Sequence, residues 1–268
     1  MVNPIQISPR FEIRKLELQH LEWAKAIISH SNVFHSPAWA KMYPDDQAER
    51  FYKSFDGTTT LVLHQINSGL SYGVFDTEYE FTRPESAETG GGNYWDLSRD
   101  PNLTGDEILQ QMDFPLASIA LAYDAADPLD FTSLTVLFEA LPDFPHLAGL
   151  LTSKDTRDPA TWQAKGPNEV LSRMGTATRA DYMHIGITKT MAHWLMWDAA
   201  ERGFRGIGIE CFHDAVHHIW TNPPAPFKAD LIAKITVDEY EKEGKDGEKT
   251  RPYPHVTQAL SKVYVHLK

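Results

Sequence analysis

The sequence holds a single cysteine, Cys211, and this scarcity limits its covalent chemistry. One thiol cannot form a disulfide within the chain, a pattern typical of proteins from reducing compartments. Cys211 ends the apolar run GIGIEC, where a thiol is ordinarily a buried core residue rather than a nucleophile. We therefore expect Cys211 to be structural and the protein to be cytoplasmic.

Long apolar runs and positive charge are also scarce. No run reaches the roughly 20 apolar residues that cross a bilayer, and residues 1–10 have no apolar core of a secretory signal. The 25 Lys and Arg against 37 Asp and Glu give a formal net charge of −12. Nucleic acids and anionic membranes bind cationic faces. We therefore expect neither as a partner, and predict a soluble protein that acts on a small molecule as a monomer or homodimer.

The chain is long and apolar enough to form one large domain. It has 268 residues, 42% hydrophobic and 11% aromatic, and no internal repeat. Residues 83–165 hold a triple glycine and many prolines, and their apolar positions lack a period that would support a separate core. We interpret 1–268 as a single domain with an N-terminal half at 11–82, an insertion or lid at 83–165, and a second half at 166–268. Tyr94 and Trp95, beside the triple glycine, are candidates for a mobile substrate lid.

Hydrophobic periodicity predicts the elements that flank this region. Asn67-Ser68-Gly69 separates two runs rich in β-branched and aromatic residues, which predicts a hairpin within 58–81. The other expected elements are a strand at 11–16, helices at 18–34, 37–43, 104–112 and 131–141, a short helix at 146–150, and antiparallel strands at 230–238 and 260–267.

The most regular stretch runs from 168 to 224. It predicts a strand at 169–178, a polar turn ending at Gly186, a helix at 187–202, a strand at 206–211 and a helix from Asp214. The turn presents the start of a long helix. Such a turn binds anions because the first-turn N–H groups lack partners within the helix and the helix dipole is positive there.

This order of elements resembles the GNAT fold of the N-acetyltransferase superfamily. The resemblance implies an α/β fold with a mixed, mostly antiparallel central sheet flanked by helices, here with a large insertion between the third and fourth strands. In that family a turn patterned (Q/R)-x-x-G-x-(G/A) holds the pyrophosphate of coenzyme A. Only Gly186 agrees with the pattern among the matching positions, which are Met183, His184, Ile185, Gly186, Ile187 and Thr188.

The resemblance further implies an acyl-CoA-dependent N-acyltransferase, most simply an acetyltransferase with acetyl-CoA as co-substrate and direct transfer in a ternary complex. Backbone N–H groups around Thr176, Ala177 and Thr178 would polarise the thioester carbonyl, and the pantetheine arm would run alongside that strand. Trp220 stands where many members carry a tyrosine that protonates the departing thiolate. An indole N–H is a donor only and cannot serve as that acid.

Amine acylation also needs a base to take the proton of the amine. The resemblance favours Glu169, near the start of the fourth strand, with Glu78 and Glu80 as rivals, although each is ordinarily a solvated strand carboxylate. Glu210 lies between apolar residues of the predicted strand 206–211, where a carboxylate needs a partner. Its partnership is either structural or catalytic.

Histidines gather after that strand. His213 and His217 are four residues apart and could share one helix face. Neither an HExxH motif nor a third ligand accompanies them, and Asp214 has the position of an N-cap, so we expect no metal site. A single histidine acting as acid or base near Trp220 is the functional alternative to capping and surface roles.

Two other functions remain open on the sequence alone. A GNAT-like protein that has lost acyl transfer could bind a small molecule, or catalyse an isomerisation or cyclisation, in the same cleft. The substituted positions Met183, Thr188 and Trp220 motivate this alternative. A non-enzymatic interaction protein could instead use the proline-rich residues 83–165 as its binding surface.

Overall fold

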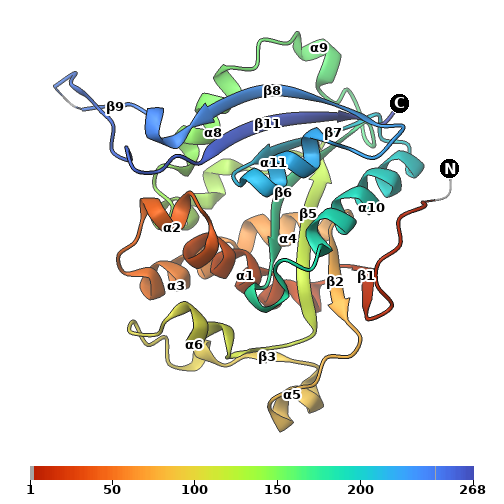
Figure 1. Ribbon diagram of the computed structural model, residues 1–268, viewed down its shortest axis with the longest axis vertical. Helices are drawn as coiled ribbons and strands as arrows, with labels where there is room; N and C mark the ends of the chain where they lie inside the picture. The colour runs from red at the N-terminus through yellow and green to blue at the C-terminus, as the bar shows by residue number, and fades with distance from the viewer. Residues whose placement is uncertain (1–2, 245) are drawn as a thin grey trace.

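A seven-stranded sheet organises the molecule (Figure 1). The computed structural model describes residues 3–244 and 246–268. The strand order is β1-β2-β5-β6-β7-β11-β8, in which β6 and β7 pair in parallel and the other neighbours pair antiparallel. The strands are β1 Phe11–Lys15, β2 Tyr72–Asp76, β5 Leu116–Asp124, β6 Val170–Thr178, β7 Gly206–Cys211, β8 Lys228–Thr236 and β11 Ala259–His266.

Helices cover both faces of the sheet. One face, called here the α1 face, carries α1 Leu21–His30, α3 Gln47–Gly57, α4 Thr59–Asn67, α7 Thr135–Ala140 and α8 Phe144–Ser153. The other, called the α10 face, carries α10 Ile187–Glu201 and α11 Asp214–Thr221, in front of the sheet in Figure 1. The remaining short elements are α2 Trp39–Met42, α5 Pro84–Thr89, α6 Gly105–Leu109, α9 Pro159–Trp162, and the paired strands β3 Gly92–Asn93 with β4 Met112–Asp113 and β9 Lys242–Glu243 with β10 Lys249–Thr250.

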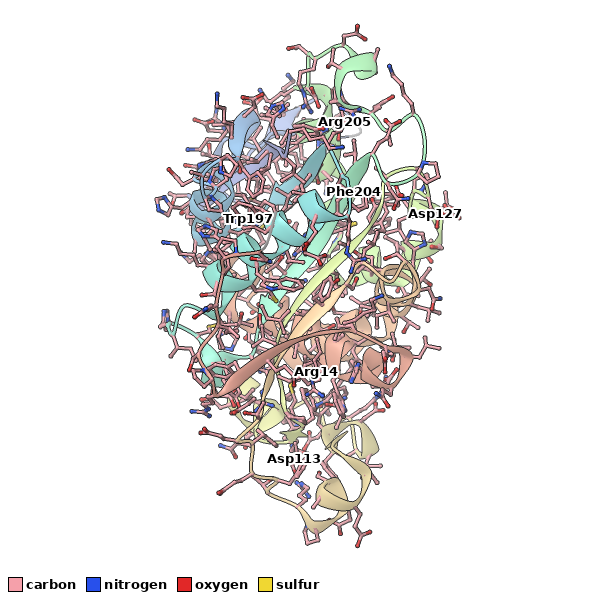
Figure 2. The ribbon with its side chains drawn as sticks, turned by 90° about the vertical axis from the view of Figure 1, so that its right-hand side faces the viewer. Arg14, Asp113, Asp127, Trp197, Phe204 and Arg205 are labelled. Carbon is pink, nitrogen blue, oxygen red and sulfur yellow. The ribbon has the colours of Figure 1, made fainter. Side chains whose placement is uncertain are left out.

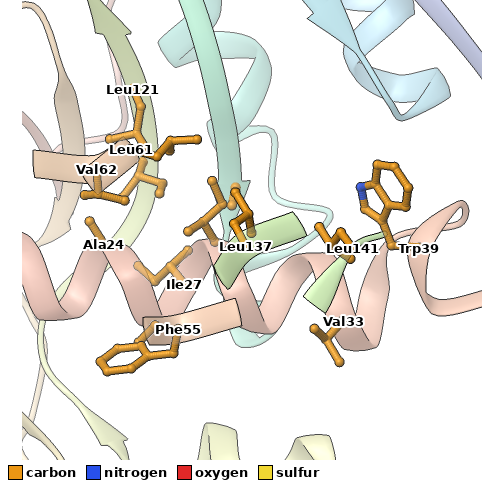
Figure 3. Packing of buried hydrophobic residues seen from close by; sticks show 14 of the residues in the cluster. Ala24, Ile27, Val33, Trp39, Phe55, Leu61, Val62, Leu121, Leu137 and Leu141 are labelled. Atoms are coloured by element: carbon orange, nitrogen blue, oxygen red, sulfur yellow. The ribbon is translucent and has the colours of Figure 1, made fainter. Parts of the chain in front are cut away.

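The main core lies on the α1 face (Figure 3). Ala24, Ile27 and Ile28 of α1 recur at helical spacing, so they form one inward stripe. This stripe packs in a cluster with Leu121 of β5 and Leu137 of α7, and all five side chains are buried. Full burial of an Ile or Leu side chain contributes about 1.5–3 kcal/mol, and these contacts fix α1 against the middle of the sheet.

The predicted second half of the chain is confirmed. Strand 206–211, the strand before the turn, and the helix that begins at Ile187 all occur where periodicity places them. The last two strands of the sheet pair antiparallel, from Ala259↔Thr236 to His266↔Lys228. The mixed, mostly antiparallel sheet flanked by helices is therefore the fold. In the part of the chain that the structure describes, every helix is too short or too polar to traverse a lipid bilayer.

The predicted hairpin at 58–81 is wrong in its first strand. Thr59–Asn67 is helix α4, whose buried residues Leu61, Val62, Gln65 and Ile66 follow a helical spacing. Of the threonines that favour a strand, Thr58 is the buried N-cap residue and Thr59 and Thr60 begin the helix, where tertiary packing outweighs propensity. Gly69, at φ +70°, ends the helix rather than turning a hairpin.

The interpretation of 83–165 as a region outside the sheet also needs correction. It contains β5, the third strand in sheet order, with the sequence LASIALAYD. Eight of its nine residues are buried because helices cover both faces, so the strand lacks the alternation that marks a half-exposed strand. The predicted helices at 104–112, 131–141 and 146–150 correspond to α6, to a 3-10 turn followed by α7, and to α8.

Trp95 belongs to the core rather than to a mobile lid. Its side chain is fully buried, and its ring lies 4.7 Å from the ring centroids of both Phe51 and Phe55. Tyr94 is partly exposed, and its hydroxyl lies 2.8 Å from the Ser86 hydroxyl.

Candidate functional site

The site begins where β6 and β7 separate. Their parallel pairing runs from Val170↔Gly206 to Arg173↔Ile209 and ends there. Beyond this point β6 continues beside β5 as far as Thr178, while β7 continues beside β11 as far as Cys211. The two strands therefore open a wedge, called here the β6–β7 wedge, whose edges carry backbone groups without a strand partner across the gap. A ligand placed in the wedge can bond to these groups.

A β-bulge lies at the apex of the wedge. Ala120 pairs with Thr176 and Ala122 with Arg173, so Leu121 faces both Met174 and Gly175. Gly175 has φ +112°, and a Cβ there would lie 2.8 Å from Cδ1 of Ile28. The bulge bends β6 away from β7 at the point where their pairing stops. A glycine is needed at position 175 because its φ is positive and because a Cβ would collide with Ile28.

The turn after β6 supplies backbone donors. His184 and Gly186 have φ of 66° and 85°, and the first N–H that bonds into α10 is that of Thr190, to the Gly186 carbonyl at 3.1 Å. Within residues 3–244 and 246–268, no group accepts a hydrogen bond from the backbone N–H groups of residues 184–189. The side chains of His184 and Ile185 are exposed and that of Met183 is partly exposed. The anion-binding capacity of this turn therefore comes from its backbone and the helix dipole.

Hydroxyl groups tie the end of β6 to the start of α10. Oγ1 of Thr178 lies 2.8 Å from Oγ of Ser118 and 2.9 Å from Oγ1 of Thr188. Thr176 also points toward the α10 face, where its Oγ1 accepts from Arg173, while Ala177 is buried on the α1 face. Thr188 therefore has a structural contact at the position where the resemblance expects a small residue.

Glu210 lies on the α1 face at the same level of the wedge. It is the first β7 residue beyond the last β6–β7 pair, and its neighbours Ile209 and Cys211 point to the α10 face. Burial raises the pKa of Glu210 to about 6, against the opposing effect of nearby Lys262. Lys262 is itself bound to Asp155 at 3.1 Å. Glu210 is thus a carboxylate whose pKa lies close to neutrality.

Arg173 and Trp220 meet on the α10 face of the wedge. The Arg173 side chain is buried, and its guanidinium carbon lies 5.6 Å from the centroid of the Trp220 ring, which is also buried. Its Nη2 donates to Oγ1 of Thr176 at 2.7 Å. Sequence reasoning did not select Arg173, although a cation inside the apolar run VLSRMG is the same signal that selected Glu210.

The structure separates the other carboxylates from the wedge. Glu169 precedes β6, accepts from the backbone N of Lys165 at 3.0 Å, and lies 3.6 Å from Nε of Arg205. Glu169 and Arg173 are four residue steps apart, about 13 Å along the strand. Figure 2 shows Arg205 and Asp113 toward opposite ends of the molecule, and two residues lie between Asp113 and the start of β5, which pairs with the end of β6. The rival positions Glu78 and Glu80 lie beyond β2 and are exposed, so they are not strand residues.

The histidines support helix α11. His213, not Asp214, is its N-cap, because His213 Nδ1 accepts from the backbone N of Ala215 at 3.0 Å. Nδ1 of His217 lies 2.8 Å from Oγ of Ser261 on β11. Burial lowers the pKa of both histidines. The described residues contain no group of three His, Cys, Asp or Glu side chains arranged to hold a metal ion.

A cavity of about 660 Å³ opens elsewhere on the α1 face, two strands away from β6. Trp23, Phe75 and the glycines 90–92 line it, together with Arg14 and Glu22. It does not extend to the wedge, since no residue of β6, β7 or the turn 183–188 lines it.

The chain was compared with known protein families, curated proteins and solved structures. No family model matches the sequence, and no curated protein matches it. Among solved structures, the arylalkylamine N-acetyltransferase 2 of Aedes aegypti has a TM-score of 0.58 at 9% identity over 96% of this chain and 99% of its own. The C-terminal condensation domain of Ebony, in complex with beta-alanyl-dopamine, has a TM-score of 0.56 at 17% identity over 95% of this chain and 98% of its own.

The chain has the GNAT fold. A polyamine N-acetyltransferase of Drosophila melanogaster adds a TM-score of 0.51 at 8% identity, over 96% of this chain and 99% of its own. In GNAT terms, β6 and β7 are the fourth and fifth strands and α10 is the helix after the turn, as the sequence resemblance implies. At these identities the likeness concerns the fold, and the chemistry has to be argued from the wedge.

Proposed function

We propose that the chain is an N-acyltransferase that moves an acyl group, in the simplest case acetyl, from acyl-CoA to the amine of a small molecule. Transfer is direct, within a ternary complex of protein, donor and acceptor. The observation that carries the proposal is the row of free backbone N–H groups at 184–189, at the mouth of the β6–β7 wedge. A diphosphate fits such donors at a helix start, and an extended thiol arm fits the wedge.

The residues present fit coenzyme A through the backbone. The turn offers N–H donors and the positive end of a 15-residue helix, and exposed Lys189 adds a cation in its first turn. Met183 replaces the Gln or Arg of the family pattern. This replacement removes one side-chain contact to the diphosphate and leaves the backbone N–H donors in place. When bound, acyl-CoA supplies an activated thioester.

Glu210 is proposed as the base that takes the amine proton. Its carboxylate lies on the face of the wedge opposite α10, and its pKa of about 6 leaves it largely ionised at pH 7 yet basic enough to accept a proton. The backbone N–H groups of residues 176–178, beside the bulge, are proposed to polarise the thioester carbonyl. Glu169 is bound to Arg205 and the Lys165 backbone at the other end of β6. His213 caps α11 and His217 bonds it to β11, so we assign none of these three side chains a chemical role.

Aromatic rings on the α1 face of the wedge suit an amine as the acyl acceptor. Phe212 follows β7 directly and stacks on Trp39 with ring centroids 5.4 Å apart, and Phe144 lies 5.7 Å from Phe212. These rings form an apolar wall on the α1 face, near Glu210. The structural neighbours act on arylalkylamines and polyamines or hold a dopamine derivative, and this supports a small amine as acceptor.

Isothermal titration with acetyl-CoA and CoA tests the donor site. Gly186→Asp and Gly203→Asp form a matched pair at the two ends of α10, because both glycines have positive φ and nothing lies within 4 Å of an added Cβ. Asp tolerates this backbone region. We expect G186D to weaken CoA binding at least tenfold through repulsion of the diphosphate, and G203D to bind as the wild type does.

Turnover with a panel of arylalkylamines, agmatine and polyamines then identifies the acceptor. The proposal is refuted if the wild type binds neither acetyl-CoA nor CoA at millimolar ligand. Binding of CoA without turnover of any amine would instead favour a GNAT-fold protein that has lost acyl transfer.

A further inference from the structure

Arg173 is a buried cation with two unused donors. Its side chain is 4% exposed, and it is the last β6 residue that pairs with β7. Nη2 donates to Thr176, whereas Nε and Nη1 have no acceptor anywhere in the described residues. The donors therefore lie at the apex of the wedge without a protein partner.

In the part of the chain that the structure describes, no anion balances this charge. The Arg173 guanidinium forms no ion pair among the described residues, and Glu210 points to the other face of the sheet. The nearby Cys211 thiol is neutral, because burial raises its pKa to about 12. Burial lowers the pKa of Arg173 to about 9, which leaves the guanidinium protonated at neutral pH. An uncompensated buried cation is costly, so its retention indicates that an anion occupies the apex during function.

The distance from the turn identifies that anion. Arg173 and Thr178 lie five residue steps apart on β6, and because of the bulge these steps lie opposite four steps of β5, about 13 Å along the sheet. An extended pantetheine arm spans a distance of that order between the diphosphate and the thiol of coenzyme A. A diphosphate on the N–H groups of 184–189 therefore brings the sulfur to the guanidinium. Sulfur becomes an anion when the thioester is cleaved.

We propose that Arg173 binds the donor sulfur and stabilises it as a thiolate when the acyl group leaves. The proposal rests on the acyl transfer proposed above. The amine nitrogen forms a bond to the acyl carbon, the carbon–sulfur bond breaks, and its electron pair departs on sulfur. Glu210 takes the amine proton. Arg173 donates hydrogen bonds to the sulfur and keeps its own protons, so the thiolate is protonated later by water.

This arrangement explains Trp220. The ring lies over the guanidinium and is 1% exposed, so it shields the cation from water instead of supplying a proton. A fixed positive charge in a dry site stabilises an anion more strongly than it does in water. Electrostatic stabilisation by Arg173 therefore takes the place of an acid at position 220.

The pKa of the thiol of bound CoA tests the proposal. Thiolate absorbs in the ultraviolet, so a pH titration of the saturated complex reports it directly. An opposite charge at contact distance shifts a pKa by roughly 1–3 units, which raises the thiolate fraction near neutrality about tenfold or more. We expect this downward shift in the wild type, its loss in Arg173→Met, and partial retention in Arg173→Lys. Arg205→Met, which removes a cation at the far end of β7, should retain the full shift.

Desulfo-CoA, in which hydrogen replaces the thiol, separates the sulfur from the rest of the donor. We expect R173M to weaken CoA binding above the thiol pKa and to leave desulfo-CoA binding unchanged, with circular dichroism showing that each variant folds. CoA bound with an unshifted thiol pKa would overturn the role of Arg173 and leave the proposed transferase intact. A different outcome is that R173M loses binding of succinyl-CoA but keeps binding of acetyl-CoA, with the same thiol pKa as the wild type. That result would mean that Arg173 binds a carboxylate of the acyl group, and it would also overturn the proposed role at the sulfur. Absence of any CoA binding by the wild type would remove both proposals.

Discussion

Replacing Arg173 by methionine should make the ligand-free protein more stable. Methionine keeps most of the apolar stem and removes a buried charge that has one hydrogen bond and one aromatic contact. The hydrogen bond and the contact with Trp220 are worth about 1.5–3 and about 2 kcal/mol. The desolvation of an unpaired ion costs several kcal/mol, and exchanges of buried ions for apolar groups stabilise proteins by about 1–4 kcal/mol. We therefore expect a gain of that size, at about 2–4 °C in Tm per kcal/mol.

Arg179→Met is the matched comparison. Arg179 is also buried near the end of β6, but its guanidinium is fully used: Nε and Nη2 donate to Asp181 at 3.0 and 2.6 Å, and Nη1 donates to the Phe114 carbonyl at 2.5 Å. Its removal should cost at least about 2 kcal/mol, because it breaks charge-assisted hydrogen bonds. Urea unfolding of both variants without ligand measures the difference. If R173M loses as much stability as R179M, the charge of Arg173 is compensated within the protein and the reasoning fails.

Three other substitutions test the site and the fold. Glu210→Gln should lower kcat about 10²–10⁴-fold and abolish the rise in rate as pH passes about 6, where the wild-type base loses its proton; pH–rate profiles of both proteins check this. Gly175→Ala should cost about 1–3 kcal/mol in urea unfolding, because φ is +112° and the new Cβ meets Ile28; an unchanged midpoint would contradict the bulge. Asp143→Asn should cost about 2–3 kcal/mol at pH 7. Burial opposes ionisation of Asp143, but bonds from Tyr253, Lys242 and Tyr43 outweigh it and lower the pKa. This stabilisation is therefore present above the unfolded pKa of about 3.9 and lost as pH falls further, so the two proteins should converge in acid.

The part of the fold predicted from the sequence is the part where the local pattern matches the element that forms. Helix α10 repeats buried residues at helical spacing, and its flanking strands are short runs of buried and partly buried residues bounded by turns, so the sequence indicates the bounds of all three. Strand β5 is buried on both faces and helix α4 starts with two β-branched threonines, so their local patterns indicate the wrong state. Only the tertiary packing around them decides between the alternatives.

The candidate site divides in the same way. The sequence alone is enough to select Gly186, as a glycine before an amphipathic helix, and Glu210, as a carboxylate in an apolar strand. Arg173 has an equally conspicuous setting, but its meaning depends on which acids lie nearby in space. The bulge at Gly175 and the end of β6–β7 pairing are likewise properties of register, which a single sequence does not carry.

The short β6–β7 pairing divides the sheet into two blocks, each contiguous in sequence. Strands from 11–178 form one block and strands from 206–266 form the other, and four residue pairs join them along the sheet. A ligand in the wedge touches both blocks at once and therefore acts as a noncovalent crosslink between them. At a concentration 100 times its Kd, such a ligand stabilises the whole protein by about 2.7 kcal/mol. The acyl donor thus binds at the same place where it holds the two blocks of the sheet together. Amide hydrogen exchange in β6 and β7 should therefore slow more than elsewhere when the donor binds.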